Sequence, residues 1–349
     1  MNIALDAMGG DRAPAEPVAG ALLANRELGL QVTLVGDPKL LQAELERHGP
    51  VPAGIRVVPA SEAIAMDETP VQAVRQKKDA SINVAMELVK RGEADAFVSA
   101  GNTGAVMASA MLHLKRVPGI ERPAIGAMAP YTERGMLVLD VGANAECKPS
   151  YLVQFAHMGS VYMEKVFGVE RPRVALLNIG VEASKGNDLT QEVYTRLQAS
   201  PLNFVGNVEA DGLHHGPADV LVTDGFTGNV AVKVTEGVAD FIFDLLKSSL
   251  TSKLRYRLAT LILRPALRDV RSHIDYSEYG GAPLLGVNGV VTVAHGRADS
   301  QAMRSALRVA QEAVAGGMLD GLRDALSERE LPKEAVVTAA TRGSGSTNA

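Results

Sequence analysis

Residues 94–115, ADAFVSAGNTGAVMASAMLHLK, decide the fold. ADAFV is typical of a short buried strand, VMASAMLHLK is typical of a helix, and SAGNTGA at residues 99–105 joins the two. Glycine allows the backbone to come close to a ligand. The N–H groups at the start of a helix have no partner within the helix and attract anions. The stretch therefore predicts a strand–loop–helix unit whose loop can wrap around something small and rich in oxygen.

Short apolar runs alternate with longer helical patterns along the chain. Strands are predicted at residues 2–6, 31–35, 55–58, 95–99, 124–129, 136–140, 173–178, 219–223 and 290–294. Helices are predicted at residues 14–28, 38–47, 81–91, 103–115, 150–166, 188–199, 228–263 and 298–316. This alternation predicts an α/β fold with a doubly wound, mostly parallel sheet.

The domain organisation follows less directly from the sequence. No change in composition marks a linker, so two interleaved lobes and two successive domains both fit the pattern. Residues 331–349 are small and polar and offer little to bury, so we expect a disordered tail there.

Composition argues against several classes of protein. A net charge of −5, an aromatic content of 4% and the absence of tryptophan disfavour binding to nucleic acid. The single cysteine, Cys147, rules out an internal disulfide and a cysteine-cluster metal site. The first residues lack the basic region of a signal peptide, and no apolar run reaches the ~18 residues that span a bilayer. These features favour a cytoplasmic protein.

Five predicted strands end in loops of one chemical character. Residues 6–11, 99–105, 140–146, 178–187 and 223–229 are rich in small and polar residues, chiefly Gly, Asn, Asp and Thr. In open α/β sheets, ligands bind outside the carboxyl ends of the strands. A single loop of this kind is best explained as an ordinary turn or helix cap. Five of them, expected at one edge of the sheet, predict a shared cleft.

Two of these loops resemble each other. Residues 97–106 (FVSAGNTGAV) align without gaps on residues 221–230 (LVTDGFTGNV). Both have two apolar residues, a hydroxyl, and then the pattern x-G-x-T-G-x-V. Our hypothesis is that the loops carrying Gly101 and Gly225 approach one ligand from opposite lobes. Coincidence between two similar turns is the alternative.

Several familiar catalytic motifs are absent. The chain has no G-x-x-x-x-G-K-[ST] P-loop, no G-x-G-x-x-G dinucleotide fingerprint and no G-x-S-x-G nucleophile elbow. The histidines, including the adjacent His214 and His215, lack the spacing of metal ligands, which favours surface or structural roles. Cys147 could serve as a nucleophile, but a lone cysteine in such a loop is more often a packed side chain. We expect neither a metal nor a cofactor.

A basic, leucine-rich segment spans residues 241–271. It holds seven basic and two acidic residues, a net charge of +5 in a chain whose overall charge is −5. Leucines recur at 246, 250, 254 and 258, and Pro265 is expected to kink or end the helix. The pattern fits a basic amphipathic element for a membrane surface or an acidic partner. A helical hairpin packed in a homodimer fits it equally well.

Six motifs, in this order and spacing, carry a family resemblance: ALDAMGGD, SAGNTGA, LDVGAN, NIGVEASKGN, TDGFTGN and YGGAPLLGVNG. Together they resemble the bacterial phosphate:acyl-carrier-protein acyltransferases, the PlsX family, over residues 1 to about 325. The resemblance implies a two-lobed α/β fold similar to isocitrate and isopropylmalate dehydrogenases and to phosphotransacetylases. It implies interleaved lobes over residues 1–330 with a protruding helical hairpin. It also implies a cytoplasmic homodimer that associates peripherally with anionic membrane and acts in phospholipid synthesis.

The implied reaction moves a long-chain acyl group from acyl carrier protein to inorganic phosphate and yields acyl phosphate. Phosphate is already an anionic nucleophile, so the protein has mainly to position the reactants and stabilise the tetrahedral oxyanion. On this basis the predicted catalytic donors are Lys185 and Asn229. The predicted phosphate-binding residues are Gly101, Asn102, Thr103, Gly104, Gly225, Thr227 and Gly228. The predicted orienting residues are Asp6, Asn144 and Asp224. Residues predicted to dock the acidic carrier or anionic lipid are Lys253, Arg255, Arg257 and Arg264.

Two other functions are kept as alternatives. A metal- and NAD-dependent 2-hydroxy-acid dehydrogenase of similar fold would want a second aspartate one helical turn after Asp224, where Gly228 stands instead. A non-catalytic, membrane-associated scaffold that tethers acyl carriers would have no need of five polar loops at the strand ends.

Overall fold

The computed structural model describes residues 1–132, 134–253 and 280–327, together with residues 256, 260, 263, 265 and 267. Its strands are β1 (Asn2–Asp6), β2 (Gln31–Gly36), β3 (Ile55–Pro59), β4 (Ala96–Ser99), β5 (Ala124–Ala129), β6 (Met136–Leu139), β7 (Arg173–Leu177), β8 (Asn203–Val208), β9 (Val220–Val222), β10 (Ala282–Leu285) and β11 (Val290–Val293). Its helices are α1 (Ala15–Leu28), α2 (Pro38–Arg47), α3 (Pro70–Gln76), α4 (Ser81–Lys90), α5 (Thr103–His113), α6 (Pro149–Phe167), α7 (Asp188–Gln198), the 3₁₀ helix η1 (Ala210–His215), α8 (Gly225–Thr251), α10 (Ser300–Ala315) and α11 (Met318–Ser327).

The strands form one sheet in the order β3-β2-β1-β4-β11-β10-β5-β6-β9-β7-β8. The first five are parallel to one another and form a first block, and the last four are parallel and form a second block. The predicted α/β fold with a mostly parallel sheet is confirmed. Between the blocks, however, the pairings β11–β10, β10–β5 and β5–β6 are all antiparallel. The second block therefore runs opposite to the first, and the expectation that all five polar loops share one edge of the sheet is wrong.

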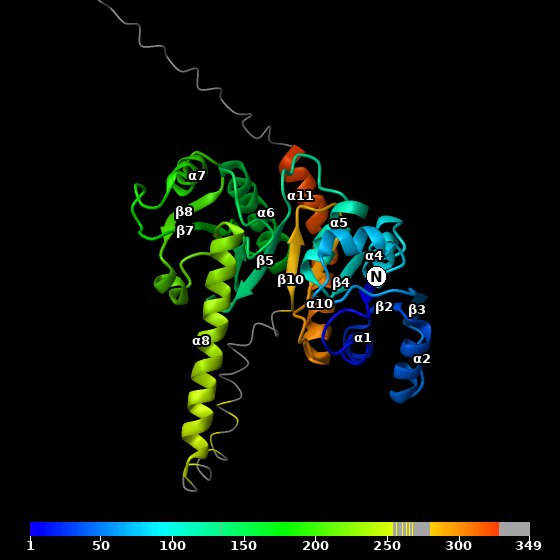
Figure 1. Cartoon of the computed structure of the whole chain (residues 1–349). Helices are drawn as coiled ribbons and strands as arrows, with labels where there is room; N and C mark the ends of the chain where they lie inside the picture. Colours follow the sequence, from blue (N-terminus) through cyan, green and yellow to red (C-terminus); the bar gives the residue numbers. More distant parts are fainter. Residues whose placement is uncertain are drawn as a thin grey trace, which may run out of the picture.

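Helices cover both faces of the sheet (Figure 1). Successive side chains of a strand point to opposite faces, and β1 shows the consequence. Ile3 and Leu5 belong to a core that includes residues of α1 and α10, whereas Ala4 belongs to a second core that includes residues of α4 and α5. The strand is apolar on both sides because both sides are buried.

The last part of the chain returns to the first block. β11 pairs with β4 in a register that runs from Val290 beside Ala96 to Val293 beside Ser99. α10 packs closely against α1, because a Cβ added at Gly20 would lie only 2.4 Å from the Cβ of Met303. The centre of the sheet is thus built from strands that are far apart in the sequence.

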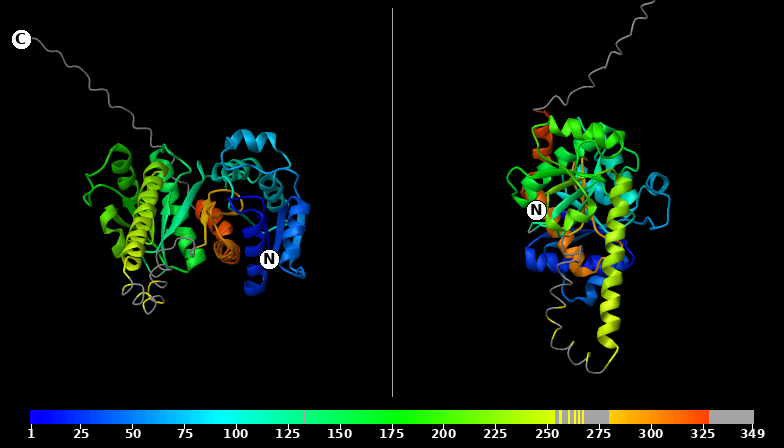
Figure 2. Two further views of the ribbon diagram at one scale, coloured as in Figure 1. Left: turned by 60° about the horizontal axis from the view of Figure 1, so that its bottom comes forward. Right: turned by 90° about the vertical axis from the view of Figure 1, so that its left-hand side faces the viewer.

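Helix α8 starts at the carboxyl end of β9 and projects well beyond the sheet (Figures 1 and 2). The sequence pattern predicted a helix over residues 228–263, and the structure places it at Gly225–Thr251. Most of the return arm of the predicted hairpin lies outside the described residues, as does the tail at residues 331–349. Within the described part of the chain, no helix is both long and apolar enough to cross a bilayer.

Candidate active site

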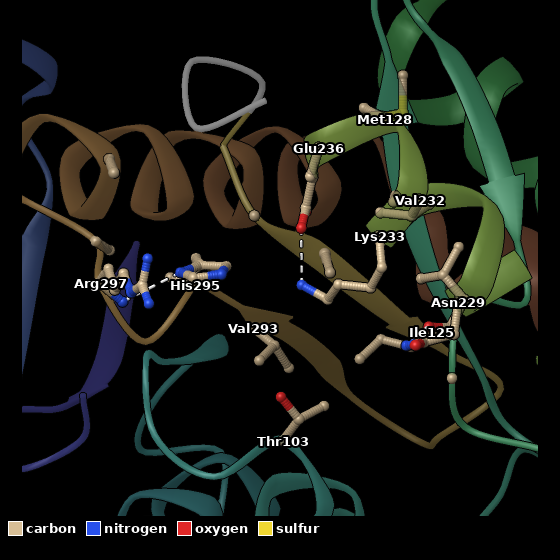
Figure 3. A pocket seen from close by; sticks show the side chains of 18 of the residues that line it. Thr103, Ile125, Met128, Asn229, Val232, Lys233, Glu236, Val293, His295 and Arg297 are labelled. Atoms are coloured by element: carbon tan, nitrogen blue, oxygen red, sulfur yellow. Dashed lines mark hydrogen bonds and ion pairs between the residues drawn. The ribbon is translucent and has the colours of Figure 1, made fainter. Parts of the chain in front are cut away.

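A cavity of about 1130 Å³ lies where loops from the two blocks meet. Thr103 and Gly104, at the start of α5, line it from the first block, and Gly142 and Asn229 line it from the second. In Figure 3, Thr103 and Asn229 border this space from different elements. Much of the remaining wall is apolar, with Met107, Ile125, Met128, Val232, Phe243 and Val293. The two similar strand–loop–helix units therefore reach one cavity, although their blocks run in opposite directions.

The start of α5 is fixed by Asn102. Its side-chain oxygen accepts a hydrogen bond from the N–H of Ala105 at 3.1 Å, which caps the helix. Its amide nitrogen donates to the carbonyl oxygens of Met66 and Glu68, each at 3.1 Å. Asn102 is buried and does not line the cavity, so its side chain shapes the helix start rather than reaching into the open space.

Asp6 stabilises the loop that precedes α5 through hydrogen bonds. Its carboxylate is fully buried and accepts hydrogen bonds from the Ser99 hydroxyl at 2.7 Å and from the N–H of Met8 at 3.2 Å. The Ser99 hydroxyl in turn accepts the N–H of Gly101 at 2.9 Å. Burial raises the pKa of the Asp6 carboxyl above its ordinary value of 3.8, and the hydrogen bonds oppose this shift. The chain Asp6–Ser99–Gly101 ties β1 to the loop after β4.

Replacing Asp6 with asparagine is expected to remove a pH-dependent loss of stability. A carboxyl whose pKa is higher in the folded state stabilises the fold below its ordinary pKa, and this stability is lost as the pH rises through the folded-state pKa. The Asp6→Asn amide keeps an acceptor for Met8 and gains a donor for Ser99. Urea unfolding at a series of pH values should show the free energy of unfolding of the variant rising relative to that of the native chain from pH 3.8 upward. A difference that stays constant with pH would contradict this account.

Asp140 and Asn144 hold the second unit together. The carboxylate of Asp140 is buried and accepts hydrogen bonds from the backbone N–H of Asn144 at 2.7 Å, from its side-chain amide at 2.9 Å, and from the N–H of Ile125 at 3.0 Å. Burial raises the pKa of the Asp140 carboxyl, and these hydrogen bonds oppose the shift. The Asn144 amide also donates to the carbonyl oxygen of Pro123 at 2.8 Å. Asn144 thereby fixes the turn that brings Gly142 to the cavity.

The start of α8 packs directly on this turn. A Cβ at Gly225 would lie 2.7 Å from Oδ2 of Asp140, and a Cβ at Gly228 would lie 2.0 Å from the Asp140 carbonyl oxygen. Asp224 caps the helix by accepting hydrogen bonds from the N–H of Thr227 at 2.8 Å and from its hydroxyl at 2.7 Å. Of the predicted residues in this loop, only Asn229 lines the cavity.

Asn229 is exposed, and its side-chain amide donates to the carbonyl oxygen of Val141 at 2.9 Å. This bond joins the first turn of α8 to the loop after β6. An amide nitrogen has a second N–H, which remains for a ligand. Asn229 therefore stands at the cavity wall as a fixed donor.

Lys185 is not brought together with Asn229 at the cavity. Its loop follows β7, which is one strand further out than β9 in the sheet order. The side chain is exposed, and its carbons lie against Gly180, where a Cβ would be 2.6 Å from Cγ of Lys185. Within a single chain, Lys185 is not among the residues that line the cavity.

The structure adds basic residues that the sequence pattern did not single out. Arg12, Lys233, His295 and Arg297 all line the cavity. His295 and Arg297 belong to the short loop AHGRAD between β11 and α10, a further strand end with a glycine before a helix. The pattern shared by the five polar loops, which is a glycine-containing polar segment between a strand and a helix, could have identified this loop as a sixth.

A family model described as "Fatty acid synthesis protein" matches residues 1–320. The chain belongs to this family. It is 50% identical over 334 residues to a phosphate acyltransferase of Desulfitobacterium hafniense, an alignment that covers 95% of this chain and 98% of the relative. It is 51% identical over 328 residues to a phosphate acyltransferase of Heliobacterium modesticaldum, with 93% and 97% of the two chains covered. The resemblance drawn from the six sequence motifs is confirmed.

A comparison with a solved structure concerns the fold of this member of the fatty acid synthesis protein family. The crystal structure of a phosphotransacetylase from Streptococcus pyogenes matches with a TM-score of 0.59 and 19% sequence identity, and the match covers 92% of this chain and 94% of that one. At this identity the likeness concerns the fold alone. It agrees with the fold expected from the sequence motifs.

Two observations concern the metal-ligating side chains and the single cysteine of this member of the fatty acid synthesis protein family. Among the described residues, no group of three or more His, Cys, Asp and Glu side chains is placed to hold a metal ion. Burial raises the pKa of the Cys147 thiol to about 11, and its sulfur lies 3.5 Å from the carbonyl oxygen of Asn144. A thiol with this pKa is protonated at neutral pH and is a poor nucleophile. Cys147 therefore packs the loop after β6.

Proposed function

We propose that the chain transfers an acyl group from the thioester of acyl carrier protein to inorganic phosphate. An oxygen of phosphate attacks the carbonyl carbon of the thioester, and a tetrahedral oxyanion forms. The C–S bond then breaks and the carrier thiolate leaves, so that the products are acyl phosphate and the carrier thiol, whose proton replaces the one that hydrogen phosphate gives up. The names of the curated relatives and the membership of the fatty acid synthesis protein family support this reaction.

The observation that carries the proposal is the meeting of two helix starts at one cavity. Thr103 and Gly104 begin α5, and among the described residues their N–H groups have no hydrogen-bond acceptor. Asn229 adds a side-chain amide from the first turn of α8. Helix starts and fixed amide donors stabilise phosphate and the developing oxyanion without further reorganisation. The apolar remainder of the wall suits an acyl chain.

The predicted site residues fall into two groups in this proposal. Thr103, Gly104 and Asn229 contact phosphate or the oxyanion. The residues that shape and hold the two helix starts are Gly101, Asn102, Gly225, Thr227 and Gly228, with Asp6, Asn144 and Asp224 behind them. Lys185 is kept as a second catalytic donor on the strength of its sequence motif alone.

We also propose that the enzyme is a cytoplasmic homodimer that contacts anionic membrane peripherally. A stripe of apolar side chains spaced three or four residues apart is exposed along α8 in the single chain, and it consists of Phe226, Val230, Val234, Val238, Phe241 and Leu245. A second copy of the chain would cover such a stripe. Of the residues proposed to dock the carrier or lipid, Lys253 is exposed beyond the end of α8, whereas Arg255, Arg257 and Arg264 lie outside the described residues.

The reaction is tested by incubating the purified protein with acyl-carrier thioester and inorganic phosphate. Free thiol should appear only when phosphate is present, and trapping with hydroxylamine should yield one acyl hydroxamate for each thiol released. Thiol release that does not depend on phosphate would indicate a thioesterase and would refute the proposal. An absence of release with phosphate present would favour a scaffold that binds acyl carriers without catalysis.

A further inference from the structure

Three basic side chains line the cavity away from the donors assigned to the transfer. They are Arg12, from the loop before α1, and His295 and Arg297, from the loop between β11 and α10. Figure 3 shows His295 and Arg297 close together on one side of the cavity, with Asn229 on the other side. All three residues are exposed, as Thr103 and Asn229 are. The proposed transfer assigns no role to any of them.

The backbone holds the two loops together. The N–H of Asp11 donates to the carbonyl oxygen of Gly296 at 2.8 Å. Arg12 comes directly after Asp11 in the chain, and Arg297 comes directly after Gly296. The loops meet closely at Gly10, which has a φ of +100°, and a Cβ there would lie 3.2 Å from the same carbonyl oxygen. Glycine adopts this conformation without strain. The backbone positions from which the two arginine side chains start are therefore fixed by main-chain contacts.

His295 is fixed within its own loop. Its Nδ1 accepts a hydrogen bond from the N–H of Arg297 at 3.2 Å. A neutral imidazole with an acceptor at Nδ1 carries its proton at Nε2, which makes Nε2 a donor. The loop thus offers an imidazole N–H next to a guanidinium group.

One guanidinium group on this side of the cavity is not engaged in an ion pair among the described residues. Among the described residues, Arg297 has no carboxylate within 4.0 Å, and Arg12 has only Glu16 at 3.8 Å. Asp299 also lines the cavity as an acidic group, and its carboxylate caps α10 by accepting the N–H of Ala302 at 2.9 Å. On the α8 side, by contrast, Lys233 is paired with Glu236 at 2.8 Å.

The rest of the α8 wall confirms this contrast. Besides the Lys233–Glu236 pair, α8 contributes Asp240, Asp244 and Lys247 to the cavity, so that wall has more acidic than basic groups. Among the described residues, Arg297 in the loop between β11 and α10 is therefore an arginine of the cavity wall that no carboxylate pairs with. An anion in the cavity would therefore meet an unpaired guanidinium group at this loop and more acidic than basic groups at α8.

We propose that Arg12, His295 and Arg297 bind the phosphodiester at the far end of the thioester's pantetheine arm. This inference rests on the proposed function. A thioester carried by a protein on such an arm has one anionic group, the phosphodiester that joins the arm to the carrier. In the proposed transfer its reacting carbon lies at Thr103 and Asn229, and the far end of the arm would extend to the other side of the cavity, where His295 and Arg297 lie. Guanidinium groups bind phosphate oxygens in bidentate fashion and discriminate strongly in favour of them.

The test uses two thioesters that differ only at the far end of the arm. One is the acyl-pantetheine, which is neutral there, and the other is the same thioester with a methyl phosphodiester at that position. With saturating inorganic phosphate, the native enzyme should show a kcat/KM about 10- to 100-fold higher for the phosphodiester. Arg297→Gln should reduce this preference to a few-fold at most, and the double variant Arg12→Gln/Arg297→Gln should abolish it. Neither change should alter kcat/KM for acyl-pantetheine or KM for inorganic phosphate.

The matched control is Arg26→Gln, which removes a largely exposed arginine of α1 that is paired with Glu27 and does not line the cavity. It should keep the full preference for the phosphodiester. Equal kcat/KM for the two thioesters in the native enzyme would overturn the inference and leave the proposed function standing. A raised KM for inorganic phosphate in Arg297→Gln, with the preference unchanged, would assign the cluster to the acceptor phosphate and would also overturn it.

A binding measurement separates this inference from the reaction itself. Unreactive thioether analogues of the two compounds can be titrated by calorimetry without any turnover. Tighter binding of the phosphodiester analogue, lost in Arg297→Gln, would support the anion site even if no acyl phosphate formed and the proposed function failed. Equal binding of both analogues would refute the anion site.

Discussion

Replacing Asn229 with alanine is expected to lower kcat by about 10²- to 10³-fold, the usual effect of removing one donor to a developing oxyanion. The structure places this amide at the cavity wall, anchored by its bond to the carbonyl oxygen of Val141. The anchor restricts the amide to one orientation before substrate binds. Turnover of acyl-carrier thioester with phosphate measures the loss, and the thermal unfolding midpoint reports whether the fold is kept.

A second variant, Asn229→Asp, tests the same prediction with a side chain of similar size. It keeps the size of the side chain but replaces the donor with a carboxylate that repels phosphate and oxyanion, so its kcat should fall at least as far as that of Asn229→Ala. A kcat within about threefold of the native value in both variants would remove Asn229 from the mechanism.

The same assay tests the second proposed donor. Lys185→Ala should lower kcat to a similar extent while keeping the fold, as its motif predicts. The loop of Lys185 follows β7, one strand further out in the sheet than β9, which precedes Asn229. The loop at residues 178–187 supplies no residue to the cavity wall of a single chain, so the structure supports this prediction less directly than the one for Asn229. Unchanged turnover in Lys185→Ala would leave Asn229 and the helix starts as the catalytic donors.

Gly228→Ala is expected to lower the free energy of unfolding by about 1–3 kcal/mol or more, the cost of forcing a methyl group into a close-packed site. The added Cβ would lie 2.0 Å from the carbonyl oxygen of Asp140 and 2.8 Å from Cγ2 of Thr223. The Asp140 carbonyl group is part of the backbone and cannot rotate out of the way as a flexible side chain can. The start of α8 would therefore have to move away from β6. That shift would displace Asn229 as well, and turnover should fall together with stability.

Gly237 provides a matched control on the same helix. A Cβ at Gly237 meets nothing within 4 Å. Gly237→Ala should therefore stabilise the protein by about 0.5–1 kcal/mol, the difference between glycine and alanine inside a helix. Urea unfolding of both variants measures the contrast. A Gly228→Ala protein as stable as Gly237→Ala would contradict the close packing of α8 on Asp140.

Most of the fold could be predicted because both faces of the sheet are buried. The strands in the centre of the blocks, such as β1, β4 and β9, are short apolar runs between glycine- and asparagine-rich loops, and this pattern is easy to identify. β8 was missed because its sequence, NFVGNV, mixes polar residues with Gly206 at a φ of +101°. β10 was missed because it is four residues long and contains Pro283. The predicted helix ran beyond the end of α8 because the helical pattern of apolar residues continues past Thr251.

The site could be predicted only in part, and the reason lies in long-range pairing. Local sequence identifies a loop that follows a strand, but not which way that strand runs in the sheet. The antiparallel strands β10 and β5 reverse the second block, and the order β6-β9-β7 sets the loop of Lys185 apart from that of Asn229. The loop of His295 and Arg297 follows a predicted strand and contains a glycine, but its place beside the loop of Arg12 depends on the pairing of β11 with β4, which local sequence does not reveal.

The late arrival of β11 has a consequence for synthesis on the ribosome. β4 has β1 on one side from early in translation, but its other edge stays open until residues 290–293 have emerged. For most of the time that the chain is being made, Ala96–Ser99 thus presents unpaired N–H and C=O groups, and such an edge invites pairing with other nascent chains. The amino-terminal half therefore cannot finish folding ahead of the rest, and chaperones have a long interval in which to bind it.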